Sequence, residues 1–335
     1  MSKIEVADGT KIAIAFPGQG AHDPEKMARL IREHSVVLPL IQEAEEELKM
    51  SLLPLLLSES TAQHVALTED ELAVTSFGPT EVMLTRDNQV KLYIGEAALW
   101  LAAQNEGVVP DNAEQYFFGA SAGEFAALMA AGAYDFSTGV RLINTRGEEM
   151  HSASIINPGE MLTATGIPIE EGRLLSEMFP GVHAVNSNPG NQTVFSGAAE
   201  GIRALGAYLT DSENWPNVTL DWPSIHEAAH TDHMAPAVPG LKKALRAVNM
   251  KRPRNFMGNQ AVMIDKVRNT KEHLAEQLTR GVLLRESAIE LRDTYEVKMF
   301  VDAGLRRVIS SQMKREFRRT VQIESIIDYL LPEKA

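Results

Sequence analysis

The chain of 335 residues contains no cysteine. This absence excludes a disulfide framework, thiolate metal sites and a cysteine nucleophile, and it fits a reducing compartment, so we expect a cytoplasmic protein. No stretch approaches the roughly 18 consecutive apolar residues that a membrane-spanning helix needs. Residues 1–16 also lack the basic region and long apolar run of a signal peptide.

Positive charge is scarce, with 32 Lys+Arg against 45 Asp+Glu and a net charge of −13. This balance argues against a general nucleic-acid-binding protein. The basic residues are nevertheless concentrated between Leu241 and Thr320, where 19 Lys+Arg face 9 Asp+Glu. Solvated helix faces would account for this skew, and so would a docking face for an acidic partner.

The order of apolar strands and helices predicts an α/β fold with a large core. After Pro158 the pattern changes to strand, helix, strand, strand, helix, strand, ending at Asp221, which is the ferredoxin-like arrangement. We therefore predict a larger α/β-hydrolase-like domain formed by residues 1–152 and 222–335. A small ferredoxin-like subdomain, residues 153–221, interrupts it. Residues 88–105 predict an amphipathic helix, and residues 235–248 predict another helix.

One stretch, residues 116–124 (YFFGASAGE), combines strand, turn and helix. Between an apolar strand and a helix lies Gly-x-Ser-x-Gly, in which two glycines permit a sharp turn that exposes Ser121. The first amides of the helix would then point to where a negatively charged intermediate forms. Ser121 is a candidate nucleophile, although turns of small residues between strand and helix are common.

Two further motifs have competing interpretations. Residues 11–16 predict a buried strand, and the turn Pro17-Gly18-Gln19-Gly20 after it either brings backbone amides to a ligand or is only a strand-to-helix connection. Residues 226–230 match the zinc motif H-E-x-x-H. The zinc interpretation needs a sustained helix and a third ligand, but Pro223 and Pro236 bracket the segment and no glutamate follows until after Lys271.

Together these segments resemble the malonyl-CoA:acyl-carrier-protein transacylases and the acyltransferase domains of polyketide synthases. The resemblance covers nearly the whole chain. Its motifs, in the family's order, are residues 16–20 (FPGQG), 119–124 (GASAGE), 141–147 (RLINTRG), 186–197 (NSNPGNQTVFSG), 229–236 (AHTDHMAP) and 276–279 (EQLT).

The resemblance implies a role for each matching residue. Ser121 would be the nucleophile and His230 the general base, and the backbone carbonyl of Gln277 would orient the imidazole. The remaining matches are oxyanion donors and substrate contacts: the backbone amides of Gln19 and Ala122 for the oxyanion, Arg146 for the malonate carboxylate, and Gln89 near the acyl pocket. An ordinary helix-surface position is the alternative for both Arg146 and Gln89.

Among the departures from the family pattern, two lie close to the motif residues Ser121 and His230. Ala120 stands where a histidine usually precedes the nucleophile. Glu227 lies three residues before His230, where a carboxylate would repel a dicarboxylate substrate unless it faced away. Both departures concern the choice of acyl group rather than the chemistry.

The sequence thus predicts an acyltransferase of fatty-acid or polyketide biosynthesis that moves a malonyl-type group from coenzyme A to an acyl-carrier protein through an acyl-serine. We expect no metal and no cofactor, with the coenzyme A thioester as substrate. The expected carrier is acidic, and it could dock on the basic C-terminal third, where Arg315, Arg318 and Arg319 lie. The alternatives are an acyl hydrolase on the same fold, a carrier-binding module without catalytic activity and a zinc protease.

Overall fold

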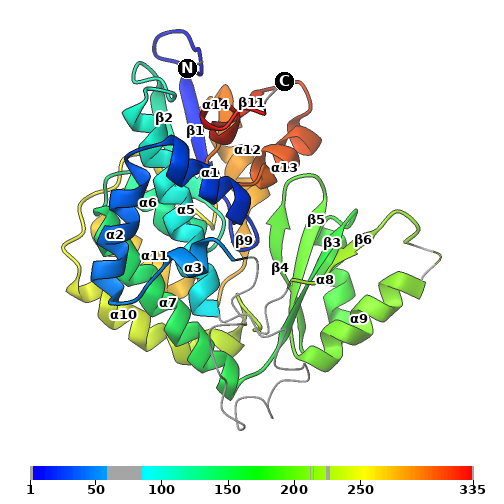
Figure 1. Ribbon diagram of the computed structural model, residues 1–335. Coiled ribbons are helices and arrows are strands. Elements are labelled where there is room, and N and C mark those ends of the chain that lie inside the picture. Colours follow the sequence, from blue (N-terminus) through cyan, green and yellow to red (C-terminus); the bar gives the residue numbers. More distant parts are fainter. Residues whose placement is uncertain (1–2, 59–84, 212, 214, 224–226, 334–335) are drawn as a thin grey trace.

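The computed structural model describes residues 3–58, 85–211, 213, 215–223 and 227–333. These residues form a mixed α/β fold with two sheets (Figure 1). Within the described residues, no helix combines the length and the apolar character needed to span a bilayer. Most of the interval 58–85 lies outside the described residues.

The larger sheet has the strand order β11-β10-β1-β2-β7-β8. Every pairing for which a register is recorded is parallel except that of β7 with β8. Its strands are β1 (Lys11–Phe16), β2 (Glu114–Gly119), β7 (Phe256–Gly258), β8 (Val262–Ile264), β10 (Met299–Asp302) and β11 (Gln322–Ser325). In the centre, Phe16 of β1 is level with Gly119 of β2, so these two strands end side by side.

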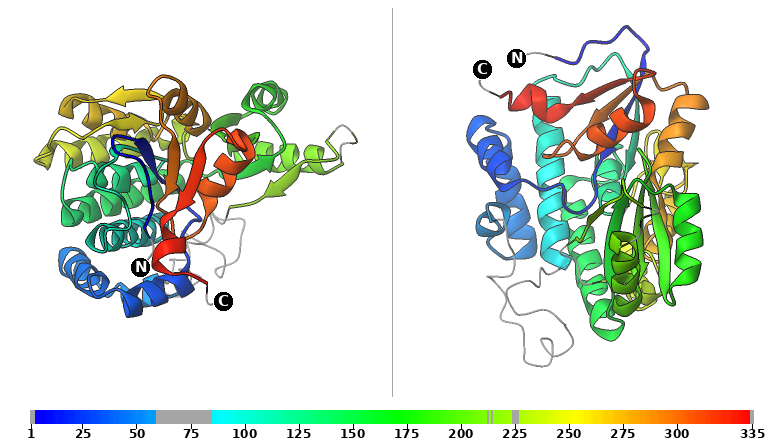
Figure 2. Two further views of the ribbon diagram at one scale, coloured as in Figure 1. Left: turned by 90° about the horizontal axis from the view of Figure 1, so that it is seen from above. Right: turned by 90° about the vertical axis from the view of Figure 1, so that its right-hand side faces the viewer.

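Helices cover both faces of this sheet (Figure 2). Because side chains alternate along a strand, Ile12, Ile14 and Phe16 face one apolar cluster, whereas Ala13 and Ala15 face another. The first cluster includes α5 (Thr85–Asn105), α6 (Gly123–Ala130) and α7 (Phe136–Ile156). The second includes α12 (Leu284–Asp293) and α13 (Val308–Phe317). Outer helices are α1 (Pro24–Glu33), α2 (Val37–Leu48), α3 (Leu53–Leu56), α10 (Val238–Ala247), α11 (Val267–Glu276) and α14 (Ile326–Leu330).

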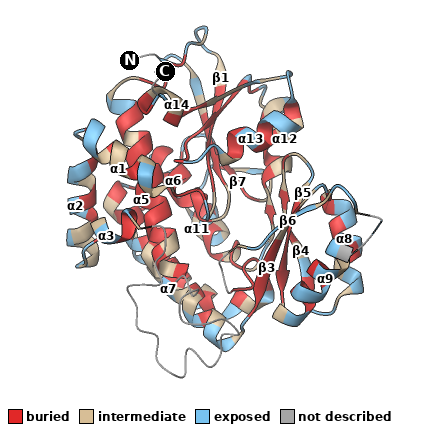
Figure 3. Ribbon diagram, turned by 45° about the vertical axis from the view of Figure 1, so that its right-hand side comes forward, coloured by how far each residue is buried: buried red, intermediate tan, exposed pale blue. Residues whose placement is uncertain are grey.

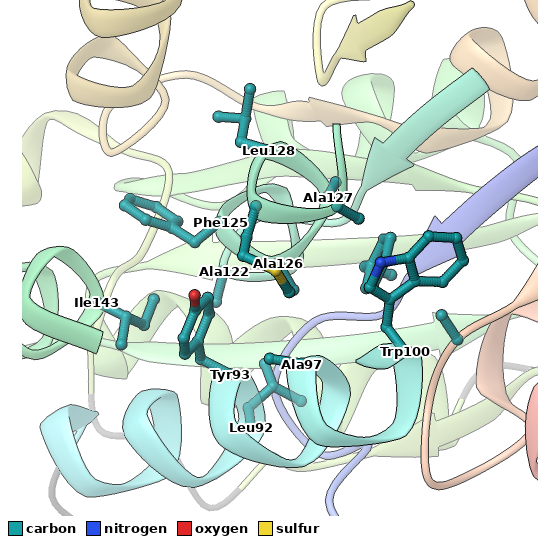
Figure 4. Close-up of a cluster of buried hydrophobic side chains, with 14 of the residues drawn as sticks. Leu92, Tyr93, Ala97, Trp100, Ala122, Phe125, Ala126, Ala127, Leu128 and Ile143 are labelled. Atoms are coloured by element: carbon teal, nitrogen blue, oxygen red, sulfur yellow. The ribbon is translucent and has the colours of Figure 1, made fainter. Parts of the chain in front are cut away.

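Helix α5 lies in the middle of the first cluster, which Figure 3 shows by its mostly buried ribbon. Trp100 packs edge-on against Phe16 and Phe117, and Tyr93 and Ala97 lie close to α6 (Figure 4). The predicted helix is therefore confirmed, but its amphipathic character is wrong. Polar residues of this helix, such as Lys91 and Glu96, are buried, since other helices pack around α5.

The smaller sheet has the strand order β6-β3-β5-β4-β9. It is built from β3 (Glu160–Thr165), β4 (Val182–Asn188), β5 (Gln192–Gly197), β6 (Thr219–Asp221) and β9 (Val282–Leu283). Leu162 and Ala164 of β3 pack in a separate cluster with α8 (Ile169–Met178) and α9 (Ala199–Asp211). Strand β9 comes from the C-terminal part of the chain and pairs with β4 in parallel.

The helix predicted over residues 235–248 is only partly correct. A 3-10 helix, η1 (Asp232–Ala237), precedes α10 instead. Pro236 lies inside η1, and Pro239 occupies the first turn of α10. A proline lacks the N–H that a continuous α-helix would need at that position. The consequence is that His230 and Thr231 lie ahead of η1 in a turn rather than on a helix.

Candidate active site

Ser121 lies in a strained turn between β2 and α6. Its φ of 53° is in the left-handed region, which is costly for a residue with a side chain. The neighbouring glycine is required, because a Cβ on Gly123 would lie 2.3 Å from the carbonyl oxygens of Phe16 and Pro17. The close approach of two backbones thus forces the serine hydroxyl out of the turn, as the sequence motif predicts.

The loop after β1 lies directly against this turn. Because β1 and β2 end at the same level, residues 17–20 run beside the serine. A Cβ on Gly18 would meet the carbonyl oxygen of Ala120 at 3.0 Å. Gln19 and Ser121 line the same cleft. The strand register therefore explains why a motif a hundred residues upstream belongs to the serine site.

His230 lies within hydrogen-bonding distance of the serine. Its Nε2 is 2.9 Å from the Oγ of Ser121. On the other side of the ring, Nδ1 is 2.7 Å from the carbonyl oxygen of Gln277 and 3.0 Å from that of Arg280. Carbonyl oxygens only accept, so Nδ1 carries the proton and donates. This leaves Nε2 as the acceptor for the hydroxyl proton of Ser121.

Burial keeps this imidazole neutral. The His230 side chain is taken out of water, and the nearby positive charge of Arg146 adds to the effect, so the pKa of His230 falls to about 4. The hydrogen bonds to the two carbonyl groups act in the opposite direction but do not offset burial. At neutral pH the ring can therefore accept a proton.

Arg146 projects from α7 into the same site and is 1% exposed. Its Nη2 donates to the Oγ of Ser121 at 3.0 Å and to the Oε1 of Gln277 at 3.2 Å. Its Nη1 donates to the Oε1 of Gln89, which is itself fully buried. Neither Arg146 nor Gln89 is a helix-surface residue. Among the described residues, the guanidinium makes no ion pair with a carboxylate, and its Nε has no partner.

Burial of Arg146 has an electrostatic cost. Desolvation lowers the pKa of its guanidinium to about 10, although the charges of Glu227 and Glu124 partly compensate. A buried cation held mainly by neutral oxygens favours a bound anion, since a carboxylate would form two parallel, charge-assisted hydrogen bonds with it.

Glu124, in the first turn of α6, links the turn at Ser121 to the segment whose carbonyls bond His230. Its Oε2 accepts from the Nε2 of Gln277 at 2.8 Å, and its Oε1 accepts from the backbone N–H of Asn259 at 2.8 Å. The Nε2 of His273 lies 2.7 Å from the same Oε1. Burial disfavours the charged form of His273, but the carboxylate outweighs this effect, and the pKa of the ring is raised.

The site opens into a cleft of about 820 Å³ between the two sheets. Ser121, Arg146 and His230 line it from the larger part, and Met161, Thr163 and Val194 line it from the smaller sheet. Arg306, Arg307 and Arg315, in and just before α13, lie along its edge. The cleft has room for an extended ligand that reaches the serine.

Glu227 does not face away from this cleft. It is 1% exposed, lines the cleft and accepts a hydrogen bond of 2.7 Å from the Oγ1 of Thr85. Burial raises the pKa of its carboxyl group to about 7, against the opposing effects of Thr85 and Arg146. Ala120, which is smaller than the histidine usual at this position in the family, lines the cleft beside Ser121.

The zinc motif is not on a helix. His226 lies outside the described residues, and residues 227–231 form bends and turns in which His230 has a φ of 63°. Both ring nitrogens of His230 already face Ser121 and backbone carbonyls. In the described part of the chain, no group of three or more His, Asp or Glu side chains is arranged to hold a metal ion.

The structure thus places five residues named in the sequence analysis at one site: Ser121, His230, Arg146, Gln89 and Gln277. His273, the carbonyl of Arg280 and the hydrogen bonds of Glu124 belong to the site as well, and none of them was predicted from the sequence. Glu124 directly follows the Gly-x-Ser-x-Gly motif. An acidic residue in the first turn of the predicted helix was the signal that the sequence offered.

A serine on a strand-to-helix turn, hydrogen-bonded to a neutral histidine within an α/β fold, defines a serine–histidine acyl-transfer enzyme. The chain belongs to the acyl transferase domain family, whose model matches residues 15–327.

Two curated proteins are similar to most of the chain. The malonyl CoA-acyl carrier protein transacylase of Bacillus subtilis (strain 168) is 28% identical over 317 residues, which cover 92% of each chain. A polyketide biosynthesis malonyl CoA-acyl carrier protein transacylase of Bacillus velezensis is 30% identical over 243 residues, 70% of this chain and 72% of the relative.

Solved structures show the same fold. The crystal structure of the Synechocystis sp. PCC 6803 malonyl-CoA:ACP transacylase superposes with a TM-score of 0.76 at 26% identity, covering 96% of this chain and 99% of the other. A malonyl-transacylase in complex with a type II polyketide-synthase acyl-carrier protein superposes with a TM-score of 0.78 at 23% identity, covering 97% and 100%.

Proposed function

We propose that this acyltransferase moves a malonyl-type acyl group from coenzyme A to the thiol of an acyl-carrier protein through an acyl-serine, in fatty-acid or polyketide biosynthesis. The observation that carries the proposal is the arrangement at the Oγ of Ser121. It lies 2.9 Å from the Nε2 of His230 and accepts from the Nη2 of Arg146 at 3.0 Å. A nucleophile, a base and a carboxylate-binding cation therefore share one centre.

In the first half-reaction, His230 accepts the hydroxyl proton as Ser121 attacks the thioester carbonyl, and it then returns that proton to the departing coenzyme A thiolate. The backbone amides of Gln19 and Ala122 are proposed to hold the oxyanion. Each such donor contributes about 2.7–4 kcal/mol to lowering the barrier. Gly18 lies against the carbonyl of Ala120, and the next residue, Gln19, lines the cleft with Ser121, which supports this role.

In the second half-reaction, the carrier's thiol gives its proton to His230 and attacks the acyl-serine, and the serine takes the proton back. One base therefore acts twice, which fits a ping-pong scheme. The carbonyls of Gln277 and Arg280 keep the ring in the required tautomer. No metal or cofactor takes part in this scheme, in which the coenzyme A thioester is a substrate.

Arg146 is proposed to bind the free carboxylate of the acyl group. Its burial and its neutral partners leave it without a carboxylate in the described structure. A hydrolase for plain acyl chains would have no use for such a cation. The curated relatives are transacylases, and they give no support to the hydrolase alternative.

The carrier is proposed to dock beside α13. Arg315, Arg318 and Arg319 are exposed there, and Arg315 also borders the cleft. Acyl-carrier proteins are acidic, so complementary charge would favour this face. A transacylase with a similar fold forms a complex with its carrier protein. A cytoplasmic location stays a prediction.

We also propose that the smaller sheet is a ferredoxin-like subdomain, residues 153–221, inserted into an α/β-hydrolase-like domain formed by residues 1–152 and 222–335. The order β6-β3-β5-β4 and the two helices on one face support this description. Strand β9 extends that sheet from outside the insertion.

Intact mass after incubation with malonyl-CoA tests the function. A stable malonyl adduct is expected, and it should be absent in Ser121→Ala but present in Ser152→Ala, which removes an exposed hydroxyl from α7. Acyl transfer to a carrier protein should follow. Rapid release of malonate without an adduct would instead indicate a hydrolase, and no reaction with any acyl-CoA would indicate a silent binding module.

A further inference from the structure

Two acidic groups would meet at one arginine when a malonyl group enters this cleft. The first is the side chain of Glu227, and the second is the free carboxylate of the substrate. Glu227 lines the cleft with Arg146 and Ser121 and is 1% exposed. Arg146 and Glu227 act on each other electrostatically, since each stabilises the charged form of the other.

Glu227 is held in this position. Thr85, the first residue of α5, donates its Oγ1 hydrogen to Glu227 at 2.7 Å and is itself 4% exposed. The adjacent Arg86 is paired with Asp87, at 2.6 Å, and so is not the counterion of Glu227. The carboxyl group is therefore fixed beside the acyl site and, as far as the described residues go, forms no ion-pairing hydrogen bond.

Other charged and titratable groups line the same cleft. On the side of the larger sheet these are His22, Lys91 and His230. Towards the smaller sheet and α13 they are Asp221, Arg306, Arg307 and Arg315. Of all these groups and Arg146, Arg146 is the one whose charge acts on the pKa of Glu227, and burial outweighs its attraction.

We infer that Glu227 is a specificity-determining residue that competes with the substrate carboxylate for Arg146, so that a malonyl-type group is accepted when Glu227 is protonated and rejected when it is ionised. Two carboxylates that share a buried site cannot both ionise without a large penalty. Uncharged acyl groups bring no second carboxylate and are not subject to this competition. The inference rests on the proposed malonyl transfer.

The consequence is a preference that changes with pH. The carboxyl group of Glu227 titrates near pH 7, because burial raises its pKa to about 7. Above that pH the protonated fraction falls about tenfold for each pH unit, and apparent affinity falls with the competent fraction. The ratio of kcat/KM for malonyl-CoA to kcat/KM for acetyl-CoA should therefore decrease roughly tenfold per unit above about pH 7. The titration of His230 affects both substrates and cancels in the ratio.

The test measures acyl-enzyme formation from malonyl-CoA and acetyl-CoA between pH 6 and 9. Glu227→Gln keeps the shape and an acceptor for Thr85 but cannot ionise. In this variant the ratio of kcat/KM for malonyl-CoA to kcat/KM for acetyl-CoA should be independent of pH. At pH 8 it should be about tenfold above the wild-type ratio. Glu148→Gln is the matched control, because Glu148 is an exposed residue of α7 that bonds Asn144. It should retain the wild-type profile.

Thr85→Val provides a second variant. Removing the hydrogen bond that favours the ionised carboxylate should move the midpoint of the ratio to higher pH while preserving its slope. A purely structural role of Thr85 would not move it. Parallel pH profiles of the ratio for the wild type and Glu227→Gln would overturn the inference even if malonyl adducts form normally. Absence of a malonyl adduct at every pH would instead refute the proposed function, and the inference with it.

Discussion

The Nδ1 of His230 lies 2.7 Å from the backbone carbonyl oxygen of Gln277, whose side chain also accepts from Arg146. One residue thus bonds the ring of His230 through its main chain and the guanidinium of Arg146 through its side-chain amide. Among the described residues, no acidic side chain bonds Nδ1 as the third member of a triad would, and backbone carbonyls fix the tautomer instead. A neutral orienting group leaves the ring without a stabilising anion, which agrees with the lowered pKa of His230.

The rate of acylation should fall at acidic pH because His230 becomes protonated there. Because burial lowers the pKa of His230 to about 4, the ring is neutral above that pH and becomes inactive as a base below it. The rate of acylation by acetyl-CoA should be level between pH 6 and 8 and should fall as pH decreases through about 4. Rapid-quench measurement of acyl-enzyme formation determines the profile. An apparent pKa near the unperturbed 6.5 would contradict it.

Replacing His230, the proposed general base, should lower the rate of acylation while the chain still folds. His230→Ala should reduce acylation by about 10²–10⁴-fold, the usual contribution of general base catalysis. His233→Ala is the matched control, since that ring lies in η1 and is not one of the residues lining the cleft. Its acylation rate should equal that of the wild type, and equal losses in both variants would remove His230 from the reaction.

Arg146→Gln tests the carboxylate-binding role. Loss of a buried, hydrogen-bonded charge partner costs about 2–5 kcal/mol, which corresponds to a decrease of roughly 30- to 4,000-fold in kcat/KM for malonyl-CoA. Acetyl-CoA has no carboxylate, so its kcat/KM should change far less. Steady-state kinetics with both donors makes the comparison. If kcat/KM fell equally for both donors, Arg146 would act through its hydrogen bond to Ser121 rather than by binding the substrate carboxylate.

Much of this site could be predicted from the sequence, because its residues lie in motifs whose order matches a family. Ser121 and His230 fall into this group, and β1 agrees with the predicted residues 11–16. The surroundings could not be predicted in the same way. Strands β7 and β9 have three and two residues, too few for a periodic pattern, and exist because longer strands offer them an edge. Glu227, for example, accepts its hydrogen bond from Thr85, which lies 142 positions away in the sequence.

His273 should make stability depend on pH. The pKa of its ring is raised in the folded chain, as Glu124 outweighs the effect of burial. The resulting stabilisation is fully present below the unfolded pKa of about 6.5 and is lost as pH rises through the folded pKa. The difference in Tm between the wild type and His273→Gln should therefore shrink as pH increases from 6 to 9. Thermal unfolding at fixed ionic strength measures it, and a constant difference would show that the Glu124 pair does not titrate.

The last prediction concerns the carrier. Arg315, Arg318 and Arg319 are exposed in and just after α13. Reversing all three to Glu should raise KM for an acidic carrier protein, since rim charges act mainly on encounter. Acylation by malonyl-CoA should be spared.

A matched control separates this local effect from net charge. Lys242, Lys243 and Arg246 belong to α10, which contributes no residue to the cleft within the described chain. Their reversal to Glu changes the charge by the same amount, and carrier kinetics should stay at the wild-type level. Raised salt should weaken carrier binding to the wild type and to this control but should have little effect on the α13 variant, because screening acts on the charges that variant lacks. Equal KM values for both triple variants would place the carrier elsewhere on the molecule.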